Sequence, residues 1–306
     1  MTLAANDDIY VIGRVFSGAN FSATAGAYQT SLRGVDDAFV LRLTNDGTST
    51  LFRTRLGGGN TVVGEVATAG FVHNNSLVLT GISLSFDFPT TPGAAQTQGA
   101  GARDAFFARL SEDGATLNSS TLMGGSGGEL TEHGITVLSD GATITSGQTH
   151  SANLPGAIGS LGGSADGFVA KLSATNMAFD FVRYVGGSGD DRLLSPVVDG
   201  QGRIYLVGQT NSTDFPVTPG AFQGAFGGGP NDGVFVILSA DGRDILYATY
   251  IGGGGDDLIR GIALDLAGNA YLVGMTSSNN FPVTSGAYQT SRGGDSDAFA
   301  LKLSIN

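Results

Sequence analysis

Paired carboxylates inside glycine-rich strings are the residues of this chain best suited to chemistry. The clearest pairs are Asp190/Asp191 and Asp256/Asp257, which end two such strings. Similar strings occur in calcium-binding β-rolls, but β-roll repeats are nonapeptides, and these pairs lie 66 residues apart. A phosphate cradle would need a following helix, whereas the residues that follow predict a strand. We expect tight crossovers where only glycine fits, and we keep these four aspartates as calcium candidates.

Other patterns that could carry catalysis are missing from the sequence. There is no cysteine, which excludes disulfides and thiolate chemistry. No His-Glu-x-x-His motif occurs, no Gly-x-Ser-x-Gly string has a histidine partner, and the three histidines (His73, His133 and His150) have no metal-ligand spacing. The sequence therefore predicts no catalytic residue, no bound cofactor and no enzymatic activity.

The paired aspartates belong to a segment that recurs five times along the chain. Its clearest mark is an apolar run ending in glycine, which recurs every 61–68 residues, at Gly13, Gly81, Gly147, Gly208 and Gly274. A period of this size is typical of an array of supersecondary units. We expect one domain over residues 1–306, with repeats at about 1–59, 60–125, 126–187, 188–253 and 254–306.

Each repeat contains four strand-like runs. In the last copy the first three are expected at residues 261–265, 270–274 and 297–303, and the third alternates Phe299, Leu301 and Leu303 on one face. Short Asp-Gly turns such as Asp241-Gly242 join the third and fourth strands. The sequence predicts an all-β fold, a β-propeller of five ~65-residue repeats with four-stranded antiparallel blades.

The fourth strand is missing from the last copy. It is expected four times, at residues 51–56, 117–122, 179–185 and 246–251. The last blade should therefore lack its outer strand, leaving Asp297–Leu303 as an open edge. Such edges recruit other strands, so we expect strand donation or self-association there.

Two further features recur once per repeat. An aspartate opens the third strand (Asp37, Asp104, Asp166, Asp232 and Asp297), and we expect it to cap backbone N–H groups rather than form a ring of ligands. A long insertion joins the second and third strands and carries an aromatic residue at one position (Tyr28, Phe222 and Tyr288). These rings are either anchors packed between blades or a binding rim. The long insertions and the glycine strings with Asp190 and Asp256 should lie together, as the surface for a protein or glycan partner.

Composition narrows the class of partner. The net charge of −12 argues against nucleic acid and anionic membranes. No apolar run is long enough to cross a bilayer, and Met1–Asp8 shows no signal-peptide pattern.

The best-preserved strings, at residues 250–257, 261–265, 268–274, 281–289 and 297–303, resemble the bacterial β-propeller repeat family often called SBBP repeats. The third copy departs from the pattern, with Leu154–Ala157 in place of the Phe-Pro-x-Thr-x-Gly-Ala string. The resemblance implies a bacterial propeller, usually in a secreted or surface-exposed protein, and brings no general catalytic motif.

These observations favour a non-enzymatic extracellular binding or structural module, acting in adhesion or in assembly of a bacterial surface structure. Two alternatives stay open. One is a carbohydrate-active lyase or hydrolase on a propeller scaffold, and the other is a passive spacer in a larger protein.

Overall fold

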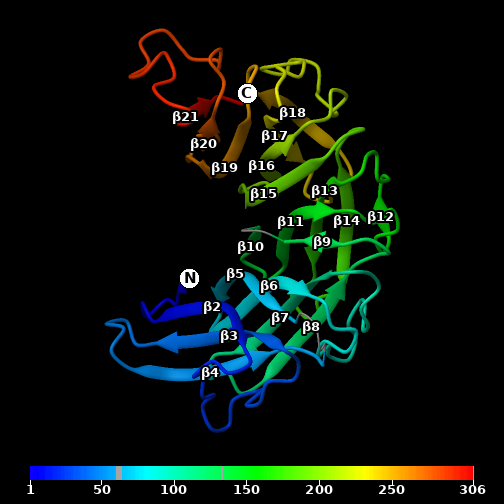
Figure 1. Cartoon of the computed structure of the whole chain (residues 1–306), viewed down its shortest axis with the longest axis vertical. Helices are drawn as coiled ribbons and strands as arrows, with labels where there is room; N and C mark the ends of the chain where they lie inside the picture. The colour runs from blue at the N-terminus through cyan, green and yellow to red at the C-terminus, as the bar shows by residue number, and fades with distance from the viewer. Residues whose placement is uncertain (60–63, 132–133, 306) are drawn as a thin grey trace. The chain divides into compact units, whose positions relative to one another are not determined.

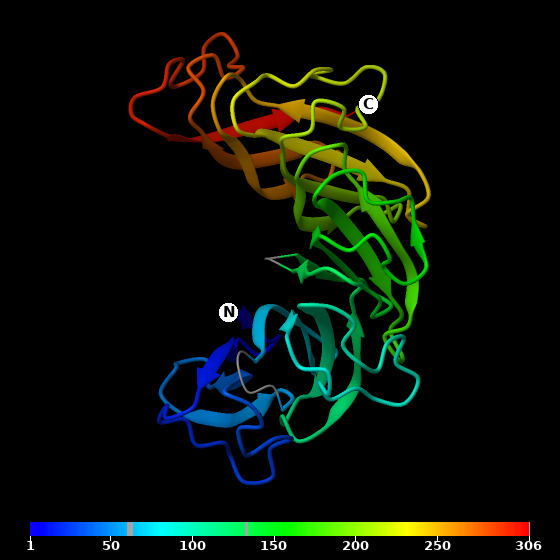
Figure 2. The same cartoon turned by 45° about the vertical axis from the view of Figure 1, so that its right-hand side comes forward.

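The computed structural model describes residues 1–59, 64–131 and 134–305. These residues form strands β1 to β21 and no α-helix. Within this part of the chain, therefore, no helix has the length and apolarity needed to span a bilayer. Consecutive strands lie side by side in most sheets (Figures 1 and 2), which gives the up-and-down antiparallel order predicted for propeller blades.

Two four-stranded sheets come first in the chain. The strands of the first sheet are β1 (Thr2–Leu3), β2 (Ile9–Phe16), β3 (Asp36–Leu43) and β4 (Thr50–Leu56). Those of the second are β5 (Val66–His73), β6 (Ser76–Ser83), β7 (Asp104–Ser111) and β8 (Leu117–Met123). All neighbours are antiparallel, so the prediction of four-stranded blades is confirmed for both repeats.

The third sheet differs from the predicted pattern. Its strands are β9 (Glu129–Leu130), β10 (Ile135–Val137), β11 (Thr143–Thr149), β12 (Ala157–Ile158), β13 (Asp166–Leu172) and β14 (Phe179–Val185). The order is β10-β11-β13-β14-β12, and β12 pairs in parallel with β14. Strand β12 belongs to the long insertion of this copy, which lies in an extended conformation along the sheet edge.

The last two sheets confirm the missing strand. The fourth sheet is β15 (Asp191–Val198), β16 (Ile204–Thr210), β17 (Asp232–Leu238) and β18 (Ile245–Ile251). The fifth sheet holds only β19 (Asp257–Leu264), β20 (Ala270–Thr276) and β21 (Asp297–Leu303), and no described strand pairs with the second edge of β21. Strand β19 begins four residues before the predicted start at 261, because a bulge between Ile259 and Gly261 interrupts its alternation.

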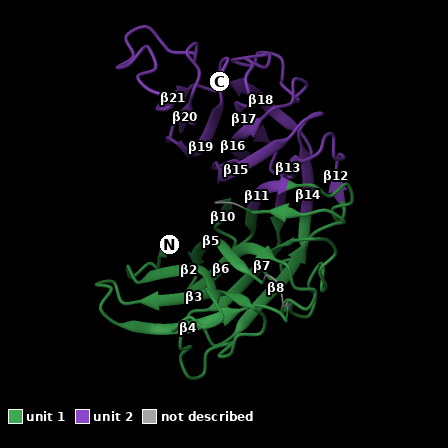
Figure 3. Ribbon diagram, viewed as in Figure 1, with its two compact units in different colours: residues 1–144, 149–156, 171–180 green, residues 145–148, 157–170, 181–306 purple. Residues whose placement is uncertain are grey.

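The chain forms two compact units (Figure 3). Unit 1 consists of residues 1–144, 149–156 and 171–180, and unit 2 of residues 145–148, 157–170 and 181–306. In unit 1 a buried cluster joins the first two sheets and includes Val40 and Phe106. In unit 2 a buried cluster joins the fourth and fifth sheets and includes Val207 and Leu272. These four sheets thus bury apolar side chains against a neighbouring sheet of the same unit.

Candidate functional site: the glycine loops and the long insertions

The glycine loops, which join the fourth strand of one sheet to the first strand of the next, are held by side-chain hydrogen bonds. In the loop that follows β18, the N–H of Gly253 donates to Asp257 Oδ2 (2.7 Å). The next three N–H groups donate to Asn280, Ser278 and Ser277 (2.6–2.8 Å), all just beyond β20. One loop N–H group is thus bound by a carboxylate, and the next three by an amide oxygen and two hydroxyls.

The hydrogen bond between the second glycine and a carboxylate recurs at four junctions between consecutive sheets. The acidic residue at or near the start of the next sheet accepts the N–H of the second glycine, in the pairs Glu65–Gly58, Glu129–Gly125, Asp191–Gly187 and Asp257–Gly253. Serine hydroxyls donate to the same carboxylates, as Ser212 does to Asp191 (2.8 Å) and Ser278 to Asp257 (2.6 Å). The carboxylates therefore hold the loops closed.

A second carboxylate faces the first glycine of each loop. It is the aspartate that opens the third strand, and as predicted it caps a backbone N–H, for example that of Gly227 on Asp232 (2.6 Å). A Cβ on Gly252 would lie 2.6 Å from Asp232 Oδ1 and 2.8 Å from Asp257 Oδ2. Only glycine fits between the two carboxylates.

Burial changes the acidity of these paired groups. Desolvation raises the pKa of Asp166 to about 6 and that of Asp232 to about 6, and in each case a neighbouring carboxylate adds to the effect. Burial also raises the pKa of Asp191. The side chains of Asp166 and Asp232 have one carboxyl oxygen each that is buried without a hydrogen-bond partner. Perturbed carboxyl groups often mark active sites, but these are only 0–1% exposed and cannot reach a substrate.

The calcium candidates fall into two environments. Asp191 and Asp257 are buried, and their carboxylates accept hydrogen bonds from N–H and O–H groups. These surroundings stabilise the carboxylate without a metal and do not supply the several oxygen ligands that calcium needs. Asp190 and Asp256 lie at the outer end of the loops, where Asp190 accepts the hydroxyl of Ser164 and Asp256 accepts the amide of Asn231 (2.7 Å). No cluster of three or more potential metal-ligating residues occurs in the described ranges. Calcium binding stays a prediction.

The histidines do not join these sites. The ring of His73 contacts its neighbour Asn74 (3.0 Å), and His150 Nδ1 lies 3.3 Å from the carbonyl oxygen of Gly128. His133 lies outside the described residues.

The long insertions run along the fourth strands and cover the sheet edges. In the fourth sheet Thr218 pairs with Ala248 through two hydrogen bonds, from its N–H to the Ala248 carbonyl (3.1 Å) and from the Ala248 N–H to its hydroxyl (3.0 Å). Thr24 with Arg53 and Thr91 with Ser120 repeat both bonds. A covered edge strand is protected from pairing with other chains. This arrangement differs from the predicted loop face, because the insertion lies against the edge strand of its own sheet.

A glutamine that sequence reasoning missed completes this attachment. The N–H of Gln223 donates to the hydroxyl of Thr249 (2.8 Å), and its carbonyl accepts the N–H of Tyr250 (3.2 Å). Its side-chain Oε1 accepts the N–H of Gly252 (3.0 Å), while Nε2 donates to Asp232 (3.1 Å). Gln29 and Gln96 repeat the three bonds to their own fourth strands. The recurrence of glutamine eight or nine residues before the capping aspartate was the available signal.

The aromatic residues of the insertions divide into packed and exposed rings. Tyr28 is partly buried and packs against the core cluster of unit 1. Phe222 is 48% exposed and Tyr288 fully exposed. The phenylalanine that opens the insertion packs on the third strand instead, as Phe281 does on Phe299 with ring centroids 4.5 Å apart. The ring at this position is therefore packed in the first repeat and exposed in the fourth and last repeats, and its role in binding stays a prediction.

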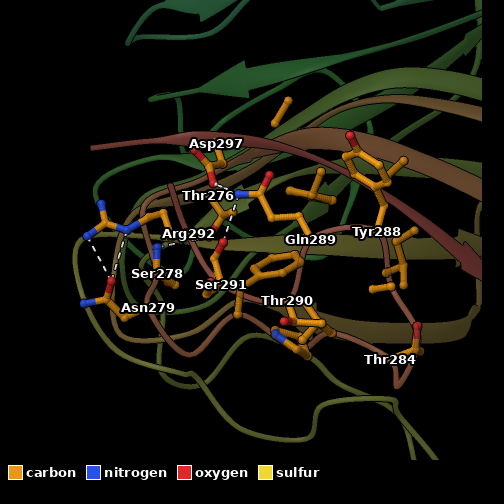
Figure 4. A pocket seen from close by; sticks show the side chains of 18 residues that line it. Thr276, Ser278, Asn279, Thr284, Tyr288, Gln289, Thr290, Ser291, Arg292 and Asp297 are labelled. Carbon is orange, nitrogen blue, oxygen red and sulfur yellow. Dashed lines mark hydrogen bonds between the residues drawn. The ribbon is translucent and has the colours of Figure 1, made fainter. Parts of the chain in front are cut away.

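In the last repeat the insertion borders an open groove of about 340 Å³ (Figure 4). Thr284, Gln289 and the edge of β21 line it, from Ala298 to Leu301. Gln289 Nε2 donates to Asp297 (2.6 Å) and to the carbonyl of Ser291 (2.9 Å), the contacts made by Gln29 in the first repeat. The groove thus occupies the place that the fourth strand fills in other repeats.

Comparison with known proteins identifies the repeat. The beta-propeller repeat (SBBP) family model matches residues 246–282, which include β19, β20 and all but the first residue of β18. The chain therefore carries a β-propeller repeat of this family, which confirms the resemblance. No curated protein matches the sequence significantly.

Several solved structures are similar over most of the chain. A protein of unknown function from Dyadobacter fermentans is 13% identical, with 92% of this chain and 72% of that chain covered and a TM-score of 0.45. A xylan β-1,4-xylosidase from Bacillus halodurans (12% identity, 89% and 47% covered, TM-score 0.36) and a GH32 β-fructofuranosidase from Bombyx mori (11%, 92% and 55%, 0.34) also match. The chain spans about half the length of these two enzymes. All three TM-scores are below 0.5, and none of the likenesses indicates an activity for this chain.

Proposed function

We propose that this chain is a non-enzymatic binding or structural module of a bacterial cell surface, acting outside the cell in adhesion or in assembly of a surface structure. The observation that carries the proposal is the use of the recurrent carboxylates. Asp191, Asp257 and their counterparts accept loop N–H groups and serine hydroxyls, so they act in holding the fold. No cofactor is proposed.

The long insertions supply the contact surface for a protein or glycan. In the first, second and fourth repeats their main chain is fixed along the fourth strands. Three aromatic rings stand exposed on the insertions: Phe86 (67%), Phe222 (48%) and Tyr288 (fully exposed). Aromatic rings on a rigid scaffold bury large contact area at little entropic cost. Sugar rings and protein side chains are both partners of this kind.

Adhesion of beads coated with the chain to cell envelopes of the source bacterium tests the proposal. Replacing Phe86, Phe222 and Tyr288 together by Ser should abolish adhesion, while Leu266→Ser, which removes an exposed apolar side chain outside the insertions, should leave it unchanged. Equal adhesion of all three proteins would contradict the proposed surface. Turnover of a xylan, fructan or uronan polysaccharide that a single Asp or Glu substitution abolishes would contradict the non-enzymatic role.

A further inference from the structure

In three repeats one threonine and one glutamine of the long insertion hold the fourth strand, and we call this pair the strand clamp. The last repeat has the clamp, but the strand that it would hold is missing from the described chain. In the first, second and fourth repeats the insertion holds the fourth strand by five hydrogen bonds, two from the clamp threonine and three from the clamp glutamine. The last repeat has both residues, as Thr284 and Gln289. Among the described residues, no strand N–H donates to the Thr284 hydroxyl or to Gln289 Oε1.

The strands held by the clamp share the same residue types at the contacted positions. The residue opposite the glutamine N–H is threonine in all three filled clamps: Thr54, Thr121 and Thr249. Two positions later comes a fully buried aliphatic side chain, Leu56, Met123 or Ile251. The glycine that donates to Oε1 follows directly, with no room for a Cβ beside the carboxylates: Gly57, Gly124 and Gly252. The held strand therefore has the form x-Thr-x-aliphatic-Gly-Gly.

In the third repeat the glutamine of the insertion and the threonine of the fourth strand are both absent. There the glutamine position is Gly159 and the threonine position is Arg183, and the two strands pair directly as β12 and β14. The glutamine of the insertion and the threonine of the held strand are thus replaced in the same repeat. The last repeat retains the glutamine, held in the orientation of the filled clamps by Asp297 and Ser291 (Figure 4).

We infer that the groove beside β21 binds an extended strand of this form, supplied by another repeat of the same type. Its hydroxyl would accept from the Gln289 N–H, its glycine N–H would donate to Gln289 Oε1, and its main chain would pair with β21 antiparallel. A second copy of β21 itself does not fit, because the sequence Asp297–Leu303 contains neither threonine nor glycine. The inference is independent of the proposed adhesive role.

Titration of the chain with synthetic peptides, followed by calorimetry, tests the inference. The probe is a peptide with the sequence of residues 117–126, the fourth strand of the second repeat. Its Thr121 and Gly124 are the two residues that bond the clamp glutamine in that repeat. It should bind at one site per chain. The third-repeat peptide, residues 179–188, carries Arg183 at the threonine position and should bind at least tenfold more weakly, as should the probe with Thr121→Val or with N-methylglycine at position 124. A tenfold loss corresponds to about 1.4 kcal/mol, the order of one hydrogen bond.

Protein variants give the matching control. Gln289→Ala should weaken the probe at least tenfold without changing the melting temperature of the free chain, because Gln289 holds no strand there. Gln223→Ala, in a filled clamp, should lower the melting temperature, and the exposed Gln201→Ala should change neither property. No binding of the probe, or equal binding of all peptides, would overturn the inference. A dimer that pairs through β21, keeps the probe from binding and is left intact by Gln289→Ala would identify a second copy as the occupant and would also overturn the inference.

Discussion

Asp232 illustrates how burial, rather than catalysis, sets the acidity of a residue. Its pKa is raised from 3.8 to about 6 by desolvation, so the folded chain binds this proton more tightly than the unfolded chain does. The resulting stability is fully present below pH 3.8 and is lost as the pH rises through 6. For one such group the loss is on the order of 2–3 kcal/mol in the free energy of unfolding.

We therefore expect Asp232→Asn, which mimics the protonated carboxyl, to be more stable than the native chain at pH 8 and to show a flatter dependence on pH. Chemical denaturation between pH 4 and pH 8 measures both effects. Asp295→Asn, at an exposed carboxylate, is the matched control and should keep the native pH dependence. Parallel curves for Asp232→Asn and the native chain would contradict the raised pKa.

The ring position shared by Tyr28 and Tyr288 should give different costs of truncation in the two repeats. Tyr28 packs against the core of unit 1, so Tyr28→Ala should lower the free energy of unfolding by about 1–3 kcal/mol. Tyr288 is fully exposed, and Tyr288→Ala should change it by less than about 0.5 kcal/mol. Thermal and chemical denaturation of the two variants check this; equal losses would mean that both rings pack alike.

Sequence reasoning predicted the residues whose partners lie nearby in the chain and missed those whose partners are distant. The capping aspartates were predicted, because Asp232 accepts the N–H of Gly227, five residues away. The clamp glutamines were missed, because Gln223 acts on Gly252, 29 residues later in the chain. A side chain that satisfies a distant backbone group leaves no local pattern beyond its recurrence in the repeats.

At the scale of the structural element, the glycine loop depends on its first glycine far more than on its third. We expect Gly252→Ala to lower the free energy of unfolding by about 1–3 kcal/mol, since the new Cβ would collide with Asp232 and Asp257. Gly254→Ala is the matched control: its Cβ would have no neighbour closer than Asn280 Oδ1, at 3.5 Å, and the cost should stay within about 0.5 kcal/mol. Urea denaturation distinguishes the two, and similar costs would show that the carboxylates move aside.

Strands were predicted well where apolar and polar residues alternate clearly in the sequence. The third strand of the last repeat, Asp297–Leu303, has the predicted bounds, and three fourth strands differ from prediction by one residue. The path of the long insertions was not predicted. Their hydrogen bonds run to strands that come later in the chain, so the fixed edge cover could not be distinguished from a free loop.

At the scale of the whole molecule, the incomplete fifth sheet should be the least protected part of unit 2. Tyr271 and Val273 of β20 are 42% and 50% exposed, whereas their counterparts Tyr205 and Val207 of β16 are fully buried. Strand β21 also lacks a partner on one edge among the described strands. Both features lower the local free energy of opening.

We expect the amide hydrogens of β20 and β21 to exchange before those of β16 and β17, which hydrogen-exchange mass spectrometry resolves strand by strand. The contrast is informative because the two sheets share one repeat pattern and one buried cluster, so intrinsic sequence differences contribute little. What separates them, among the described residues, is that the fifth sheet lacks a fourth strand and leaves Tyr271 and Val273 exposed. Equal protection of the two sheets in the free chain would mean that another part of the protein already covers the fifth sheet.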